Sequence, residues 1–167
     1  MNVRRRTSSW LMYLFLATGS IGCYESTSPL SPPGSVRVEP VLMGTWRCVP
    51  DPVKPGENAT LRVFRFDDVQ YYFEWVEGNE VSRLRAYGSR IGQTVLLNVQ
   101  ELKAKDPSGK WIFVPYRLES PDKLRVAIVK EQAVKGLPER EALGAIRRRV
   151  TDDSLYEAWQ ICSREAS

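Results

Sequence analysis

Apolar and polar positions alternate along most of the chain between residues 42 and 130, which is the pattern of half-buried β-strands. The clearest case is Val69–Val76, in which Tyr71, Phe73 and Trp75 fall on one face of the strand. Turn-forming residues separate the alternating segments. The predicted strands are Leu42–Val49, Ala59–Phe66, Val69–Val76, Val81–Ile91, Thr94–Leu102, Trp111–Leu118 and Leu124–Val129. We therefore expect a mainly β fold, an antiparallel up-and-down meander of about seven strands.

The pattern changes to a helical period after the last predicted strand. Leu143, Ile146 and Val150 recur at three- and four-residue spacing, and Pro138 suits the first turn of a helix. This spacing predicts one helix that follows the strands directly.

A second helix is predicted at the C-terminal end. Ser154 and Glu157 have the spacing of a capping box, and Leu155, Trp159 and Cys162 fall on one helical stripe. This stripe would turn Cys162 inward against the sheet. A meander that curls into a partial barrel and is covered by two C-terminal helices would bury all these faces.

The first 22 residues have the features of an export signal. Arg4–Arg6 precede an apolar run over Trp10–Gly19, and the small residue Gly22 stands before Cys23. A membrane-spanning helix needs about 20 apolar residues, so this run is too short for a permanent anchor. We expect residues 1–22 to be a signal peptide that is removed on export.

The position of Cys23 behind this run resembles the signal of bacterial lipoproteins. The resemblance implies that Cys23 is acylated on sulfur, becomes the new N-terminus and attaches the protein to a membrane. The following residue is Tyr24 and not Asp. By the same resemblance this implies the outer membrane of a diderm bacterium, in its cell envelope.

The remainder divides into a short linker and one domain. Residues 23–40 are rich in Ser and Pro and poor in large apolar side chains, which predicts a mobile tether. Residues 41–167 are enough for one compact core and too few for two. We expect them to form a single barrel-like domain with its C-terminal helices.

Cys48 and Cys162 form an even pair once Cys23 is set aside. In an exported protein the oxidising compartment favours a disulfide between them. The alternative is two reduced cysteines that pack as small apolar side chains. The Cys-x-x-Cys spacing of redox-active sites is not present.

The segment Gly44-Thr45-Trp46, at the start of the first strand, resembles the Gly-x-Trp motif of lipocalin-like barrels. The resemblance implies a barrel with one end closed by Trp46, beside an arginine that the sequence leaves unassigned.

Charge and composition exclude several classes of function. Removing Arg4, Arg5 and Arg6 from the 24 basic residues leaves 21 against 20 acidic ones, without the net basic surface of nucleic-acid-binding proteins. The chain has no histidine, and it lacks the sequence motifs of hydrolases and nucleotide-binding enzymes. We expect no enzymatic activity, cofactor or metal, and we interpret Asp67-Asp68 as a turn and not as a calcium site.

The aromatic side chains leave two interpretations open. Trp46, Tyr71, Phe73 and Trp75 would line a ligand cavity, or they would fill a packed core, which is commoner in a small barrel. The first interpretation predicts a module that binds a small apolar or amphiphilic ligand. The second leaves a non-enzymatic interaction protein, whose outer face docks another protein of the cell envelope.

Overall fold

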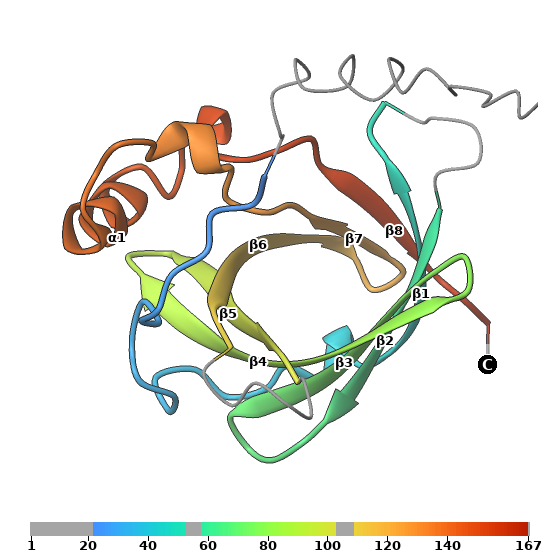
Figure 1. The fold of residues 1–167 in the computed structure, drawn as a ribbon. Helices are drawn as coiled ribbons and strands as arrows, with labels where there is room; N and C mark the ends of the chain where they lie inside the picture. Colours follow the sequence, from blue (N-terminus) through green and yellow to red (C-terminus); the bar gives the residue numbers. More distant parts are fainter. Residues whose placement is uncertain (1–21, 53–57, 103–108, 167) are drawn as a thin grey trace, which may run out of the picture.

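The computed structural model describes residues 22–52, 58–102 and 109–166. Its strands form a closed antiparallel barrel, in which each strand pairs with the next and the last pairs with the first (Figure 1). The strands are β1 (Gly44–Pro50), β2 (Ala59–Arg65), β3 (Gln70–Glu77), β4 (Glu80–Ile91), β5 (Thr94–Glu101), β6 (Trp111–Ser120), β7 (Lys123–Val126) and β8 (Gln160–Arg164). The predicted mainly β meander is confirmed, and the barrel is lipocalin-like in its general kind. The predicted signal peptide lies almost wholly in residues 1–21, outside the described residues.

The predicted second C-terminal helix is wrong, and the barrel is closed rather than partial. A short 3-10 turn covers Asp153–Leu155, with the Asp152 carboxylate accepting a hydrogen bond from the Ser154 amide, and the chain then extends into β8. Strand β8 pairs with β7 on one side and β1 on the other. These two sets of backbone hydrogen bonds outweigh the local helical pattern, because without β8 both neighbouring strands would have unpaired edges.

The predicted disulfide is present at the seam between the first and last strands. Cys48 on β1 and Cys162 on β8 are direct partners in the strand register, and their sulfur atoms are bonded. Both side chains are fully buried, and 114 positions separate them in the sequence. The disulfide therefore crosslinks the strands that close the barrel.

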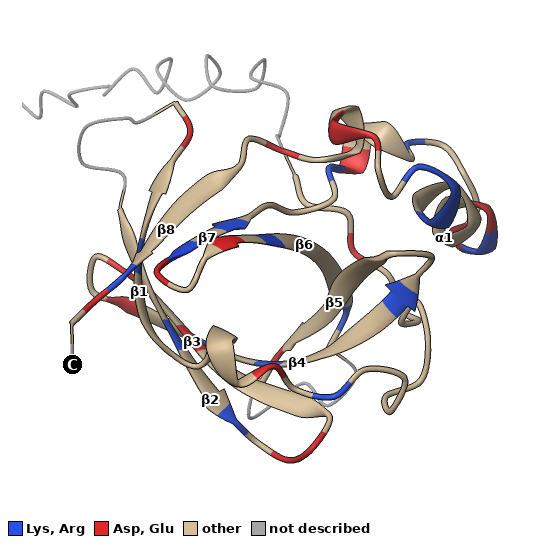
Figure 2. Ribbon diagram, turned by 180° about the vertical axis from the view of Figure 1, so that it is seen from behind, with Lys and Arg blue, Asp and Glu red and all other residues tan. Residues whose placement is uncertain are grey.

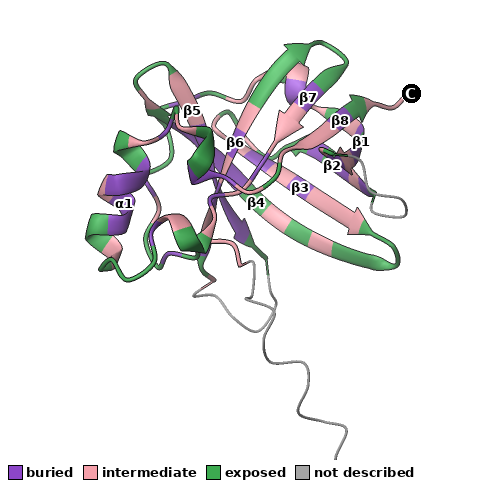
Figure 3. Ribbon diagram, turned by 90° about the horizontal axis from the view of Figure 1, so that it is seen from above, coloured by how far each residue is buried: buried purple, intermediate pink, exposed green. Residues whose placement is uncertain are grey.

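Apolar side chains form two cores, one inside the barrel and one on its outer surface. The outer core lies between β4–β6 and the helix α1 (Glu139–Arg148), which confirms the first predicted helix. Tyr87, Leu96 and Phe113 on the strands pack in this core with Ile146 of the helix. Figure 3 shows the buried side of α1 turned towards the barrel.

Residues 22–38, which we call the N-terminal strap, differ from the expected mobile tether because they pack along the barrel. The Tyr24 amide donates to the Val129 carbonyl, and Ser26 pairs with Trp111. Leu30 is 3% exposed, and its amide donates to the side-chain oxygen of the fully buried Asn98 at 2.8 Å. The Ser/Pro composition hid this packing, since the strap needs only a few apolar contacts and a buried polar partner supplied by the barrel.

The strap is also held to α1 by one carboxylate. The hydroxyls of Ser26 and Thr27 donate to Glu139 at 2.9 and 2.7 Å. The Thr27 bond, followed by the Ser26 bond, lowers the pKa of Glu139 to about 2. A carboxylate with a lowered pKa stabilises the folded state above its unfolded pKa, and the effect is lost as the pH falls through the folded value.

We predict that Glu139 titrates near pH 2 and that Thr27→Val moves its pKa back towards the ordinary range. The strap contact should weaken only as the pH falls from about 4.3 towards that value. NMR titration of the Glu139 carboxyl signal measures both effects. A Glu139 pKa that Thr27→Val leaves unchanged would contradict the proposed cause.

We predict that replacing Cys48 and Cys162 together by alanine lowers the free energy of unfolding by about 2–5 kcal/mol, because a long closed loop is released in the unfolded chain. Urea denaturation of the exported protein measures the loss. Ser163→Ala is the matched control, since Ser163 is exposed on β8 next to Cys162. Equal unfolding midpoints for the double variant and the control would argue against a stabilising crosslink.

Candidate functional site

One end of the barrel is closed by a 3-10 turn, Pro40–Leu42, and by the side chain of Trp46. The indole N–H of Trp46 donates to the Leu42 carbonyl at 2.9 Å. The guanidinium of Arg164 lies 4.1 Å from the centre of the Trp46 ring and donates to the Met43 carbonyl at 2.7 Å. Arg164, on β8, thus occupies the place of the arginine that the lipocalin resemblance implied and the sequence left unassigned.

Gly44 is required by this arrangement. Its φ of +122° lies in the region that side chains disfavour, and a Cβ atom there would lie 2.7 Å from Nη1 of Arg164. The first residue of the Gly-x-Trp segment therefore makes room for the arginine that packs on the third.

Above this closed end the barrel contains an apolar cavity of about 380 Å³. Leu42 of the 3-10 turn forms part of its floor, and the remaining wall comes from β2 to β8 and the segments flanking β8 and β7. Residues on the central strands that line the cavity are Leu61, Val63, Phe73, Trp75, Leu84, Leu97, Val99, Ile112, Val114, Tyr116, Leu124 and Val126. None of the described residues lining it carries a charge.

The cavity exists because the interior side chains are too small to fill the barrel. The large rings of Trp111 and Phe113 lie in the outer core, so that β6 presents Ile112 and Val114 to the interior. Both of these interior side chains are only partly buried. An eight-stranded barrel has room for its own side chains or for one small ligand, and here the side chains leave space.

The four aromatic residues predicted to line a cavity divide into two pairs. Phe73 and Trp75 line the cavity, whereas Trp46 and Tyr71 lie outside its lining and belong to the buried interior core. The Tyr71 hydroxyl accepts a hydrogen bond from the Glu39 amide at 2.6 Å. The cavity interpretation and the packed-core interpretation therefore each describe one part of the same interior.

Sequence reasoning missed the aliphatic part of the cavity wall. Leu84 on β4, Leu97 on β5 and Val114 on β6 line it. Leu84 alternates with Arg83 and Arg85, so a strand places it on the face opposite to theirs. The missing information was which face is interior, since β5 has buried side chains on both faces.

Tyr116 lines the cavity, and its hydroxyl is neutral. It donates to Oε1 of Glu39 at 2.7 Å. Burial, followed by this bond and the charge of Glu39, raises the pKa of Tyr116 above its ordinary range. Burial also raises the pKa of Tyr71. Neither phenol ionises at physiological pH, so the interior offers a ligand an uncharged surface.

A second hollow, of about 500 Å³, lies where β5 and β6 separate beyond the Leu96–Pro115 pair. It shares Tyr116 with the apolar cavity, but Glu39, Arg90 and Arg117 also line it. Glu39 accepts from Tyr116, and Arg117 forms an ion pair with Asp153 at 2.5 Å. Several of its polar groups already have partners within the chain, so the apolar cavity is the better candidate site.

Charges on the outer surface of the strands are mixed and partly paired. Glu74 lies between Arg62 and Arg83, at 3.3 and 3.8 Å. Figure 2 shows basic and acidic positions interspersed over the barrel. Basic and acidic side chains on these strands thus form ion pairs with each other.

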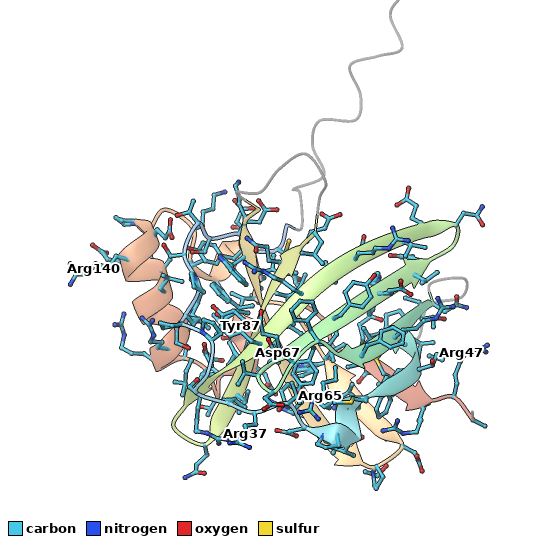
Figure 4. All side chains as sticks on the ribbon, turned by 90° about the horizontal axis from the view of Figure 1, so that it is seen from below. Arg37, Arg47, Arg65, Asp67, Tyr87 and Arg140 are labelled. Atoms are coloured by element: carbon cyan, nitrogen blue, oxygen red, sulfur yellow. A yellow bond between two sulfur atoms is a disulfide. The ribbon has the colours of Figure 1, made fainter. Side chains whose placement is uncertain are left out.

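The Asp67-Asp68 pair forms the turn between β2 and β3. Oδ1 of Asp67 accepts from the amides of Val69 and Gln70 at 2.8 and 2.7 Å. The Val69 bond is the largest cause that lowers the pKa of Asp67. Arg65 lies beside this turn, where its Nε donates to the Asp67 carbonyl at 3.2 Å (Figure 4).

Among the described residues, no group of three or more acidic, histidine or cysteine side chains could hold a metal ion. No helix in the described part of the chain is long and apolar enough to cross a membrane. Comparison with known protein families, with curated proteins and with solved structures found no match to this chain.

We predict that Arg164→Leu lowers the free energy of unfolding by about 2–4 kcal/mol, because the Met43 and Val41 carbonyls lose their donor. Thermal or urea unfolding measures the change. Arg47→Leu is the matched control, since Arg47 is exposed and forms a surface ion pair with Glu165 at 3.5 Å. Equal effects of the two substitutions would show that Arg164 does not support the closed end.

Proposed function

We propose that this protein is an exported binding module, anchored in a bacterial cell envelope through lipid on Cys23, that holds a small apolar or amphiphilic molecule inside its barrel. The proposal includes the signal peptide over residues 1–22 and, from Tyr24, the outer membrane as its site. One observation carries the binding role: a closed barrel in which part of the interior apolar surface lines a cavity of about 380 Å³ and is not covered by other side chains.

Part of the apolar wall of the cavity is accessible to water. Trp75, Leu84, Ile112 and Val114 face the interior and remain only partly buried. Covering apolar surface stabilises by about 25 cal/mol per Å² removed from water. A ligand that displaces water from this wall would gain that free energy, and the volume falls within the range of small-molecule pockets.

The chemistry of the wall selects the ligand class. The polar groups of the cavity lining are few, among them Ser82 and Gln160 near the ends of their strands and the Tyr116 hydroxyl, which is already bonded to Glu39. A charged group placed inside would lose its hydration without a partner, which costs several kcal/mol. An apolar molecule, or the apolar part of an amphiphile, fits this surface.

We predict that Leu84→Trp, which fills the cavity from β4, weakens binding of the apolar fluorescent probe phenylnaphthylamine by about tenfold or more. The mature chain, exported and purified without denaturation, is titrated with the probe. Native mass spectrometry of the same preparation shows whether a molecule bound in the cell is released on denaturation.

Val81→Trp is the matched control, because Val81 lies on the same strand and is 45% exposed. Circular dichroism and unfolding curves confirm that both variants fold. Probe affinity that is equal in the two variants would exclude the barrel interior as the binding site.

A second candidate function is docking of an envelope protein on the outer face. Phe66 is 70% exposed at the end of β2, and the nearby Phe64 packs on Tyr72 with ring centres 5.9 Å apart. Such rings are unusual on a free surface and typical of interfaces. Phe66→Ser should then abolish a crosslink formed in cells while leaving probe binding unchanged.

A further inference from the structure

The N-terminal strap begins beside the open end of the apolar cavity. Ile128 lines the cavity, and the next residue, Val129, accepts a hydrogen bond from the Tyr24 amide at 2.9 Å. Cys23 forms an antiparallel bridge with Lys130. Cys23 therefore lies opposite Lys130, which is two residues along the chain from Ile128 in the cavity wall.

This end is the one opposite to the closed floor. Ile112 at the start of β6, Trp75 near the end of β3 and Ser82 near the start of β4 line the cavity there. Ala158, also in the lining, is exposed, so the cavity reaches the surface at this end. Figure 3 shows the β3–β4 hairpin and the start of β6 at one end of the barrel and the β4–β5 turn at the other.

The strap leaves little slack between Cys23 and the barrel. A flexible linker of n residues would let the domain move by about 5–6 Å times the square root of n. Here the Tyr24 amide, one residue after Cys23, donates to the Val129 carbonyl at 2.9 Å, and the Ser26 amide donates to the Trp111 carbonyl at 2.9 Å. A lipid attached to Cys23 would hold this end of the barrel, and not the closed end, next to the bilayer.

The side chains of this rim include exposed apolar groups. Val81 is exposed on the β3–β4 hairpin, and Leu102, bonded through its amide to the Arg83 carbonyl, is exposed beyond the end of β5. Behind them the cavity wall is uncharged. Glu77 and Glu80 are exposed on the same hairpin, so the rim is mixed in character, and an acyl chain would meet continuous apolar surface from Val81 inward while its polar head stays outside.

We propose that the open end of the barrel faces the membrane leaflet that carries the Cys23 lipid, and that the cavity takes a hydrocarbon chain of a lipid from that leaflet. This inference rests on the proposed lipid anchor and binding role. It adds the orientation of the barrel and the source of its ligand.

The test places a fluorophore at either end of the lipid-bearing full mature protein. Val81→Cys labels the open rim, and Gln93→Cys labels the β4–β5 turn at the closed end. The proteins are inserted into vesicles of phosphatidylethanolamine and phosphatidylglycerol with brominated acyl chains. We expect bromine to quench the label at position 81 several-fold more than the label at position 93.

The mass of the N-terminal peptide separates the two proposals. A Cys23 without acyl groups would overturn the anchor and, with it, the orientation. An acylated Cys23 with equal quenching at both positions, or stronger quenching at position 93, would overturn the orientation alone. Stronger quenching at position 93 would place Phe64 and Phe66 at the membrane instead.

Uptake of the chain is measured with the same vesicles. A phospholipid with one fluorescent acyl chain should change its emission on binding the anchored protein, and Leu84→Trp should remove most of that change. Phe64→Trp, at an exposed position near the closed end, is the matched control. Equal signals from wild type and Leu84→Trp would overturn the leaflet as the source of the ligand, whether or not the soluble probe binds.

Discussion

The seam between β1 and β8 is the constraint on which the rest of the structure depends. It closes the sheet, and its side chains Trp46 and Arg164 also hold the 3-10 turn whose Leu42 forms part of the floor of the cavity. Cys48 and Cys162 are bonded across it, and Arg164 reaches from β8 to the carbonyls of the 3-10 turn before β1. A barrel without this seam would have two free edges and an interior open at both ends.

Because the barrel is closed, the size of its interior side chains decides whether a ligand cavity remains. Since the circumference is fixed by the strands, the interior is either filled by side chains or left as a cavity. Near the floor it is filled, by Trp46 and Tyr71. Farther along, β6 carries its large rings on the outside, against α1 and the strap, and presents Ile112 and Val114 inward. The outer core thus uses the side chains that would otherwise have occupied the cavity.

Much of this fold could be predicted from local alternation, and the errors arise where distant partners decide. Tyr71, Phe73 and Trp75 share a face in the sequence and in the structure, because the period of a strand fixes it. The segment from Ser154 to Cys162 satisfied a helical period by chance, and only the unpaired edges of β1 and β7 made its end a strand. The disulfide partner of Cys48 could have indicated the strand at this position. Because Cys48 faces inward, Cys162 must lie on a neighbouring strand or beneath the sheet.

The order of the strap also depends on distant residues that its own composition does not reveal. Its Ser- and Pro-rich composition predicts mobility, and its order depends on groups more than 60 residues away, such as Asn98 and Glu139. Asn98 is fully buried and would be unsatisfied without the Leu30 amide, because its own amide group is already bonded to Tyr87 and Ser89. The strap therefore completes a polar network as well as an apolar one. That requirement fixes the path of the strap along the barrel, and so a segment with the composition of a spacer determines which end of the cavity lies nearest to Cys23.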